Sequence, residues 1–326
     1  MTRGLVIGKF MPLHLGHVAL IRFAASQCDE VIVSMSFKPD DPIEGSLRFL
    51  WIREFFKNEP NIKPAISVDD FDNEALTIDE RTKLWASFIK KRFPPVNILF
   101  SSEKYGEPFA KNLGVTHVMF DSERKQFQVS ATLIRKNPFR YWNFLPEVVR
   151  PYFVKKICFY GPESTGKSTM AKHFAKRYQT EFVPEVAREL ITSNDFSVED
   201  IIKIGKAQTD RVKQKLKTAN RFLFCDTDLI TTEIYSQKYL NVIPEILIEL
   251  EKEIHYDLYF LFDIDVPWVA DGLRDLTDQR EAMKEVFEEE LVKRKIQFIR
   301  VTGSWEQREK IIHDALQSRF PLDDGR

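Results

Sequence analysis

Short apolar runs alternate with amphipathic stretches along this chain of 326 residues, and this alternation constrains the fold more than any other feature. An apolar run, a helical pattern and a second apolar run are typical of parallel strands joined by crossover helices. The sequence therefore predicts an α/β protein. In the first part of the chain, strands are expected at residues 5–8, 30–36, 65–68, 97–101 and 117–120, and helices at 15–26, 46–57 and 79–92.

A second series of the same kind begins at residue 156, after a stretch that contains Pro138, Pro146 and Pro151. Proline interrupts regular elements, and 326 residues exceed the size at which one hydrophobic core usually stops growing. Two domains are therefore expected, residues 1–150 and 151–326, each with a parallel sheet. In the second domain, strands are expected at 156–160, 181–183, 222–225, 258–262 and 297–301, with a helix at 169–178.

The formal net charge is only -1 at pH 7, so no broad attraction to nucleic acid or to an anionic membrane is expected. The 3 cysteines occur singly, and no apolar stretch approaches the length of a membrane span. We expect a cytoplasmic protein whose partners are small molecules, with no nucleic acid and no membrane. Assembly into a homo-oligomer stays open.

The first candidate site is the segment 8–17, which connects the first apolar run to the first helical pattern. Parallel sheets bind ligands at such positions, where glycine permits close backbone approach and a helix start offers free N–H groups. Two imidazoles three residues apart can both face an anion there. A capping histidine beside a surface histidine is the alternative interpretation. The candidate residues are Gly8, Lys9, Phe10, Met11, His14 and His17.

The pattern G-x-F-x-P-x-H-x-G-H of this segment resembles the H-x-G-H nucleotidyltransferases, which have Rossmann-like folds. In that family, a substrate phosphate attacks the α-phosphorus of ATP and pyrophosphate leaves, without a covalent intermediate. The resemblance implies that His14 and His17 hold the α- and β-phosphates and that Lys9 adds charge. Such chemistry needs alignment and charge neutralisation more than a nucleophilic side chain.

The second signature of these nucleotidyltransferases, S-x-T-x-x-R, matches residues 130–135. Its candidate residues are Ser130, Thr132 and Arg135, and the resemblance implies that Ser130 and Arg135 grip the outgoing pyrophosphate. A surface ion pair is the alternative interpretation of Arg135.

Residues 161–169 satisfy the P-loop pattern G-x-x-x-x-G-K-[ST] between a predicted strand and a predicted helix. Backbone N–H groups of such a loop form an anion nest, Lys167 would reach the β- and γ-phosphates of ATP, and the Ser168 hydroxyl would bind Mg²⁺. A P-loop kinase domain is therefore expected. The candidate residues are Gly161, Glu163, Ser164, Thr165, Gly166, Lys167, Ser168 and Thr169.

Carboxylates follow two other predicted strands of this domain. Asp226 ends the apolar run 222–225 and is the expected second Mg²⁺ ligand, with Asp228 as the alternative. Glu185 follows the strand 181–183 and is a candidate general base for the acceptor hydroxyl, as is Asp226. A charge that favours the start of a helix is the alternative interpretation of Glu185.

A charged segment near residue 274 predicts a lid that brings arginines to the transferred phosphoryl group, as in nucleoside and nucleotide kinases. Arg274 and Arg280 are the candidates, and a solvated charged loop is the alternative interpretation.

Beyond these signatures, the chain is similar to the bacterial bifunctional nicotinamide-mononucleotide (NMN) adenylyltransferases and ribosylnicotinamide kinases. The similarity spans nearly the whole chain and includes N-P-F-R-Y-W at 137–142, D-T-D at 226–228 and P-W-V-A-D-G-L-R at 267–274. It implies ATP-dependent phosphorylation of nicotinamide riboside to NMN in the second domain, and adenylylation of NMN to NAD in the first. Some members carry an N-terminal helix-turn-helix repressor domain, which is not expected here because the first strand begins within the first few residues.

The nicotinamide ring of both acceptors is a cation, so an aromatic face or a carboxylate should recognise it. Trp85 in the first domain, and Trp268 with Asp271 in the second, are the candidates, although tryptophans in such patterns are more often core residues. Arg48 and Arg53 are candidates for the NMN phosphate. Two other functions stay open: a fusion that acts on another vitamin-derived acceptor, such as a pantetheine phosphate or a flavin, and a non-catalytic sensor of NAD and ATP.

Overall fold

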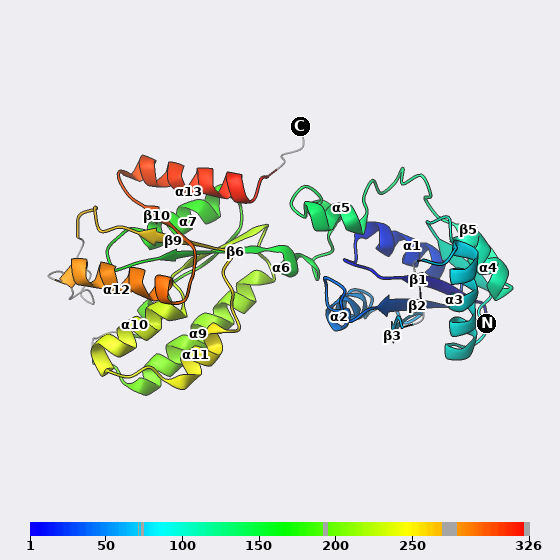
Figure 1. The fold of residues 1–326 in the computed structure, drawn as a ribbon, viewed down its shortest axis with the longest axis horizontal. Coiled ribbons are helices and arrows are strands. Elements are labelled where there is room, and N and C mark those ends of the chain that lie inside the picture. Colours follow the sequence, from blue (N-terminus) through cyan, green and yellow to red (C-terminus); the bar gives the residue numbers. More distant parts are fainter. Residues whose placement is uncertain (71, 73–74, 192–194, 269–278, 323–326) are drawn as a thin grey trace. The chain divides into compact units, whose positions relative to one another are not determined.

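The computed structural model describes residues 1–70, 72, 75–191, 195–268 and 279–322. The chain divides into two compact units, one formed by Met1–Val149 and a second that begins at Arg150. Each unit contains a five-stranded sheet, and all strand pairs in both sheets are parallel (Figure 1). The predicted α/β class with two parallel sheets is confirmed.

The sheet of the N-terminal unit has the strand order β3-β2-β1-β4-β5. The chain changes direction across the sheet between β1 and β4, and ligands bind outside the carboxyl ends of strands at such a point. The elements of this unit are β1 (Arg3–Gly8), α1 (Leu15–Ala25), β2 (Glu30–Phe37), α2 (Gly45–Phe55), β3 (Ile62–Val68), α3 (Ile78–Arg92), β4 (Ile98–Ser101), α4 (Gly106–Leu113), β5 (Thr116–Met119), α5 (Ala131–Lys136) and the 3-10 helix η1 (Trp142–Phe144).

Helices cover both faces of this sheet. One face packs against α3 and α4 in a buried apolar cluster of Leu5, Ile32, Ala86, Ile89, Leu99, Phe109, Ala110 and Leu113. On the other face, Phe23 of α1 makes an edge contact with Phe100 of β4. Helix α3 begins at a capping box, in which the Glu80 N–H donates to the Thr77 hydroxyl and the Thr77 N–H donates to the Glu80 carboxylate. Every expected strand and helix of this unit is present, and α4 and α5 are additional.

The sheet of the second unit has the order β10-β9-β6-β8-β7, with β6 in the centre. Helix α7 begins at Lys167, two residues earlier than expected, because the lysine and serine of the P-loop form its first turn. The elements are α6 (Arg150–Phe153), β6 (Lys155–Tyr160), α7 (Lys167–Arg177), β7 (Glu181–Val183), α8 (Ala187–Leu190), α9 (Val198–Leu216), β8 (Phe222–Asp226), α10 (Leu229–Leu240), α11 (Glu245–Glu251), β9 (Leu258–Phe262), α12 (Arg280–Lys293), β10 (Phe298–Val301) and α13 (Trp305–Arg319).

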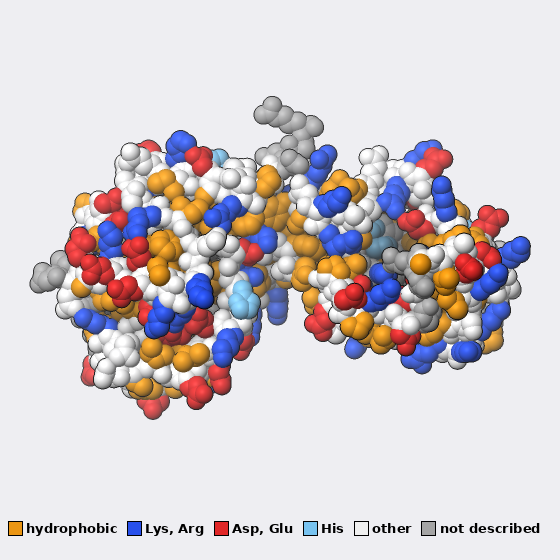
Figure 2. Space-filling view, viewed as in Figure 1, with side chains coloured by type: hydrophobic (Ala, Val, Ile, Leu, Met, Phe, Trp, Pro, Cys, Tyr) orange, Lys and Arg blue, Asp and Glu red, His pale blue; other side chains and the backbone are white. Residues whose placement is uncertain are grey.

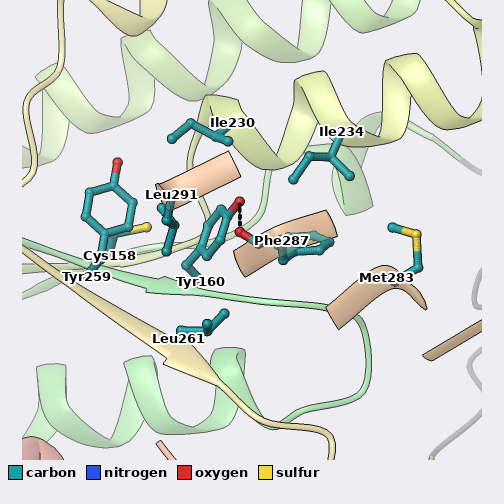
Figure 3. Packing of buried hydrophobic residues seen from close by; sticks show 9 residues of the cluster. All are labelled: Cys158, Tyr160, Ile230, Ile234, Tyr259, Leu261, Met283, Phe287 and Leu291. Atoms are coloured by element: carbon teal, nitrogen blue, oxygen red, sulfur yellow. Dashed lines mark hydrogen bonds between the residues drawn. The ribbon is translucent and has the colours of Figure 1, made fainter. Parts of the chain in front are cut away.

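The core of the second unit fixes β6, the strand that leads into the P-loop. In Figure 1, α7 and α13 lie on one face of the sheet, and α9, α10, α11 and α12 lie on the other. On the latter face, Tyr160 packs among side chains of α10 and α12 and donates its hydroxyl proton to the Phe287 carbonyl over 3.1 Å (Figure 3). On the opposite face, Phe159 contacts Phe174 of α7. Both strand residues are fully buried, so the strand end is held rigidly.

Acidic and basic side chains are interspersed over the visible face of each unit in Figure 2, as the near-zero net charge suggests. In the part of the chain that the structure describes, no helix is both long and apolar enough to cross a membrane.

Candidate active sites

The two histidines of the N-terminal unit are brought together at the start of α1. His14 is the N-cap of this helix, and its Nδ1 accepts a hydrogen bond from the His17 N–H over 3.4 Å. The two rings are stacked with centroids 3.7 Å apart, and Phe10 makes an edge contact with His17. The capping role expected as an alternative is therefore present, and it sets the spacing of the imidazoles.

Both imidazoles line a cavity, open to solvent, outside the carboxyl ends of β1 and β4. Pale-blue histidine atoms are visible in a hollow of this unit in Figure 2. Further residues that line the cavity are Gly8, Phe10, Gly16, Ser102, Glu103, Tyr105, Asp121, Arg124, Ser130 and Thr132. The histidine segment and the S-x-T-x-x-R segment thus face the same space.

Arg135 joins these two segments. Its guanidinium donates hydrogen bonds to the Met11 carbonyl and, over 3.3 Å, to the Thr132 hydroxyl. Ser130 is the N-cap of α5 and accepts from the Leu133 N–H over 3.2 Å. These contacts differ from the surface ion pair that was the alternative interpretation of Arg135.

The histidines are uncharged in the free protein. Burial lowers the pKa of His14 to about 3, with a second contribution from the nearby positive charge of Arg124. Burial also lowers the pKa of His17 far below its usual range, and His14 and Arg124 lower it further. Neutral imidazole donates one hydrogen bond, so each ring can bind an anion without being a cation. Arg124 was missed from the sequence, where it is only one residue of a charged run.

A second cavity lies beside the first and shares Ile7, Gly8 and Tyr105 with it. Trp85 lines this cavity and also packs edge-on against Tyr105 and Phe109 of the core. The Arg81 guanidinium lies 5.3 Å from the centroid of the Trp85 ring. Other polar residues that line the cavity are Lys9, Ser34, Ser36, Asp69 and Asp72.

Arg48 is not available to bind a phosphate, which corrects the expectation from the sequence. Its side chain is fully buried, with one nitrogen 2.6 Å from the Asp41 carboxylate and another donating to the Lys9 carbonyl over 2.6 Å. A buried cation with these partners fixes the backbone of the histidine segment instead. Arg53 is exposed on α2 and lines neither cavity of this unit.

The P-loop of the second unit has the backbone that its glycines permit. Gly161 has φ +133 and Gly166 has φ +87, and a Cβ at Gly161 would lie 2.8 Å from the Phe262 carbonyl oxygen. Glycine is therefore required at the first position. The Lys167 ammonium is buried and donates to the Pro162 carbonyl over 2.7 Å. The remaining loop candidates are Ser164, with φ +57, the buried Thr165, and Thr169, which is exposed on α7.

Asp226 ends β8 next to this loop and is almost fully buried. Its Oδ1 atom has no hydrogen-bond partner among the described residues. Burial, followed by the negative charge of Glu185, raises the pKa of Asp226 to about 6, while Lys167 and a hydrogen bond from Ser168 oppose this rise.

Asp228, the alternative to Asp226, has a structural role. It is the N-cap of α10 and accepts hydrogen bonds from the Thr231 N–H over 3.1 Å and from the Tyr259 hydroxyl over 2.9 Å. Both of its carboxylate oxygens therefore have partners within the core.

A cavity that is open to solvent lies beside the P-loop. Glu185 lines it and forms an ion pair of 2.7 Å with Arg188. Its polar and aromatic lining consists of Glu163, Glu185, Arg188, Phe196, Gln208, Thr227, Thr231, Thr232, Tyr235 and Tyr239. The aromatic residues were missed from the sequence because they come from the segment before α9 and from α10, with no spacing that marks them.

Trp268 is not among the residues that line this cavity. It lies against Arg280, whose guanidinium carbon is 5.4 Å from the ring centroid and whose terminal nitrogens donate to the Val266 carbonyl. The structure therefore places Trp268 and Arg280, both predicted from the sequence as site residues, in contact with each other. Asp271 and Arg274 lie outside the described residues.

Comparison with known proteins identifies the family. The sequence is 33% identical over 328 residues to the trifunctional NAD biosynthesis/regulator protein NadR of Escherichia coli (strain K12), across 92% of this chain and 78% of that protein. The chain belongs to the NadR family. The model of a further family, described as an AAA domain, matches residues 156–308. A nicotinamide-nucleotide adenylyltransferase of Methanolobus tindarius is 29% identical over 107 residues, 31% of this chain and 57% of that protein.

Solved structures of NadR proteins share the fold of both units. A NadR protein in complex with NAD and AMP-PNP matches with a TM-score of 0.82 at 23% identity, across 98% of this chain and 96% of that chain. A NadR protein in complex with NR matches with a TM-score of 0.81 at 22% identity, across 100% of this chain and 98% of that chain. These structures confirm the expected fold of both units, and the 33% identity to the Escherichia coli protein confirms the family resemblance.

The burial of Asp226 gives a first prediction for this NadR-family chain. Because the folded state raises the pKa of this carboxyl above its usual 3.8, its contribution to stability is fully present below about pH 4 and is lost as the pH rises through about 6. Asp226→Asn removes the buried charge and should raise the free energy of unfolding at pH 7.5 by about 1–2 kcal/mol. Urea unfolding measures this, and a lower free energy of unfolding in the variant would contradict the account of Asp226.

Proposed function

We propose that this chain makes NAD in two ATP-dependent steps. The unit that begins at Arg150 phosphorylates nicotinamide riboside to NMN, and the N-terminal unit transfers the adenylyl group of ATP to NMN. The observation that carries the proposal is the pair of anion-binding turns, each at the end of a central strand and each beside a cavity. Membership of the NadR family supports both activities.

In the adenylyl transfer, a phosphate oxygen of NMN attacks the α-phosphorus of ATP, and the bond between this phosphorus and the bridging oxygen breaks to release pyrophosphate. His14 and His17 donate hydrogen bonds to the α- and β-phosphates from fixed positions. Ser130 and Thr132, which line the cavity, hold the pyrophosphate, and Arg135 holds the two segments together through its bonds to Met11 and Thr132. The rate gain comes from alignment and from stabilisation of developing charge, because no side chain forms a bond to phosphorus.

The second cavity of the N-terminal unit accepts NMN. It meets the ATP cavity at Gly8, so an acceptor phosphate there can approach the α-phosphorus. Lys9 adds positive charge at this end. The face of Trp85 already has a cation over it, the Arg81 guanidinium, and the positively charged nicotinamide ring can use the same attraction. Asp69 provides negative charge in the same cavity, whereas the Asp72 carboxylate is paired with the Arg81 guanidinium.

In the kinase step, a ribose hydroxyl of nicotinamide riboside attacks the γ-phosphorus of ATP and ADP leaves. Glu185 accepts the hydroxyl proton, because it lines the acceptor cavity while Asp226 faces Ser168. Glu163, Glu185 and the ring of Tyr235 suit a cationic nicotinamide ring. The Lys167 ammonium leaves the Pro162 carbonyl for the β- and γ-phosphates.

Ser168 and Asp226 fit a magnesium ion. A buried carboxylate with an oxygen that lacks a partner in the described structure, next to a hydroxyl, suits a hard cation that takes most other ligands from phosphates and water. Bound Mg²⁺ would neutralise charge on the β- and γ-phosphates. The roles proposed for Lys167 and Glu185 rest on contacts within the protein and do not depend on the metal ion.

The test is to incubate the purified chain with ATP, Mg²⁺ and one acceptor at a time, and to separate the products. We expect NMN and ADP from nicotinamide riboside, and NAD and pyrophosphate from NMN. Pantetheine phosphate and a flavin nucleotide serve as acceptor controls and should react at least about 100-fold more slowly. If either control reacted faster than NMN, that control would be the acceptor in place of NMN. Binding of NAD and ATP without turnover would indicate a sensor.

A further inference from the structure

Arg124 lies on the loop between β5 and α5 and lines the ATP cavity of the N-terminal unit. Among the described residues that line this cavity, it is the one arginine or lysine. Lys9 lines the neighbouring cavity, and the Arg135 guanidinium donates to the Met11 carbonyl and to Thr132. Arg124 is also close enough to both imidazoles for its charge to lower the pKa of each.

The loop that carries Arg124 is built around the Asp121 carboxylate. This carboxylate accepts hydrogen bonds from the backbone N–H groups of Lys125, Gln126 and Phe127, over 2.8, 3.2 and 3.2 Å. The Arg124 N–H also donates to the Asp121 carbonyl over 2.8 Å. The Asp121 carboxylate is thus hydrogen-bonded within the loop. These bonds fix the position from which the Arg124 side chain extends.

The side chain of Arg124 has a partner that it can leave at low cost. Its guanidinium is 2.8 Å from the Glu103 carboxylate, and the two side chains are 43% and 53% exposed. Exposed ion pairs contribute little to stability because water and salt screen them. A triphosphate carries several negative charges, so it competes well with a single carboxylate for this guanidinium.

We propose that Arg124 is a further catalytic residue of the adenylyl transfer, which leaves Glu103 when ATP binds and holds the β- and γ-phosphates that depart as pyrophosphate. This inference rests on the proposed function. The uncharged imidazoles orient the phosphates through hydrogen bonds, and Arg124 provides the full positive charge that a departing pyrophosphate requires. Glu103 keeps the guanidinium at the cavity in the free protein.

The test measures the kinetics of NAD formation from NMN with ATP as the varied substrate, in the full chain. Arg124→Gln should lower kcat/KM for ATP about 100-fold, with most of the loss in kcat because the charge develops in the transition state. Arg124→Lys should recover about tenfold of this loss, since it keeps the charge and loses the bidentate geometry.

Lys125 provides a matched control. It is the next residue of the same loop, is 78% exposed and pairs with Glu123, so Lys125→Gln should leave NAD formation unchanged.

Two outcomes would overturn the inference: a kcat/KM for ATP in Arg124→Gln within threefold of the natural protein, or an equal loss in Lys125→Gln. Riboside phosphorylation should be the same in all variants and reports their folding. If the natural protein forms no NAD from ATP and NMN, the proposed function fails. If it forms NAD and Arg124→Gln does so equally well, only the role of Arg124 fails.

Discussion

Replacing Lys167 with alanine is expected to lower the rate of riboside phosphorylation about 1,000-fold, or about 4 kcal/mol of transition-state stabilisation, and to leave NAD formation from NMN unchanged. The ammonium is buried at the start of α7 and is held by a single carbonyl of the loop, that of Pro162. Phosphate oxygens can replace this carbonyl. Burial lowers the pKa of Lys167, and the negative charges of Asp226 and Glu185 oppose this lowering.

Initial rates of the two reactions, measured on the same preparation, test this prediction. Lys176 lies on the same helix and is exposed, so Lys176→Ala is the matched control and should keep both activities. Removal of the buried Lys167 cation leaves the neighbouring carboxylates without a positive partner and destabilises the fold. Circular dichroism should therefore be used to check that the variant is folded. Loss of NAD formation in a folded Lys167→Ala protein would contradict the assignment of separate sites to the two units.

The sites that were predictable from the sequence are those whose spacing is local. In both turns, a strand, a glycine and a helix start follow one another within a few residues, so sequence spacing alone positions the backbone N–H groups and the charged side chains. Arg124 and Tyr235 have no such spacing. Each reaches a cavity only because the strands and helices around it are packed, and charged runs and helical aromatic residues are equally common at positions that face no cavity.

Arg48 shows the opposite error. An arginine on an amphipathic helix usually faces solvent, and the sequence suggested a phosphate ligand. Its burial is decided by Asp41, in the loop before α2, whose carboxylate lies 2.6 Å from the guanidinium. An ion-pair partner such as Asp41 cannot be recognised from residue type alone, because acidic residues are common in such loops.

Helix α4 was missed for a related reason. It begins with Gly106, and glycine usually indicates a turn. Here a Cβ would lie 2.0 Å from the Ser101 hydroxyl oxygen and 2.3 Å from His117 Nε2, so the glycine is required by close packing against two strands. Only the folded arrangement of β4 and β5 shows this requirement. The buried strands were easier to predict, since a short apolar run between polar segments is typical of a parallel strand that is covered on both faces.

Replacing His17 with alanine is expected to lower NAD formation about 1,000-fold while riboside phosphorylation is unchanged. His17 lines the ATP cavity, is stacked on His14 and has a ring nitrogen, Nδ1, with no partner in the described structure. Its role at the N-terminus of α1 is different from that of His14, because the bond that caps the helix uses the backbone N–H of His17 and the side chain of His14.

This difference separates catalysis from folding. His14→Ala should lose activity and also about 1 kcal/mol of stability, since it removes the cap of α1, whereas His17→Ala keeps the cap. Thermal unfolding of the two variants, compared with their rates of NAD formation, therefore distinguishes the loss of a phosphate-binding imidazole from the loss of a helix start. If His17→Ala unfolded as readily as His14→Ala, or if it kept full NAD formation, the imidazole of His17 would be part of the framework and the adenylyl transfer would have to depend on other groups in the cavity.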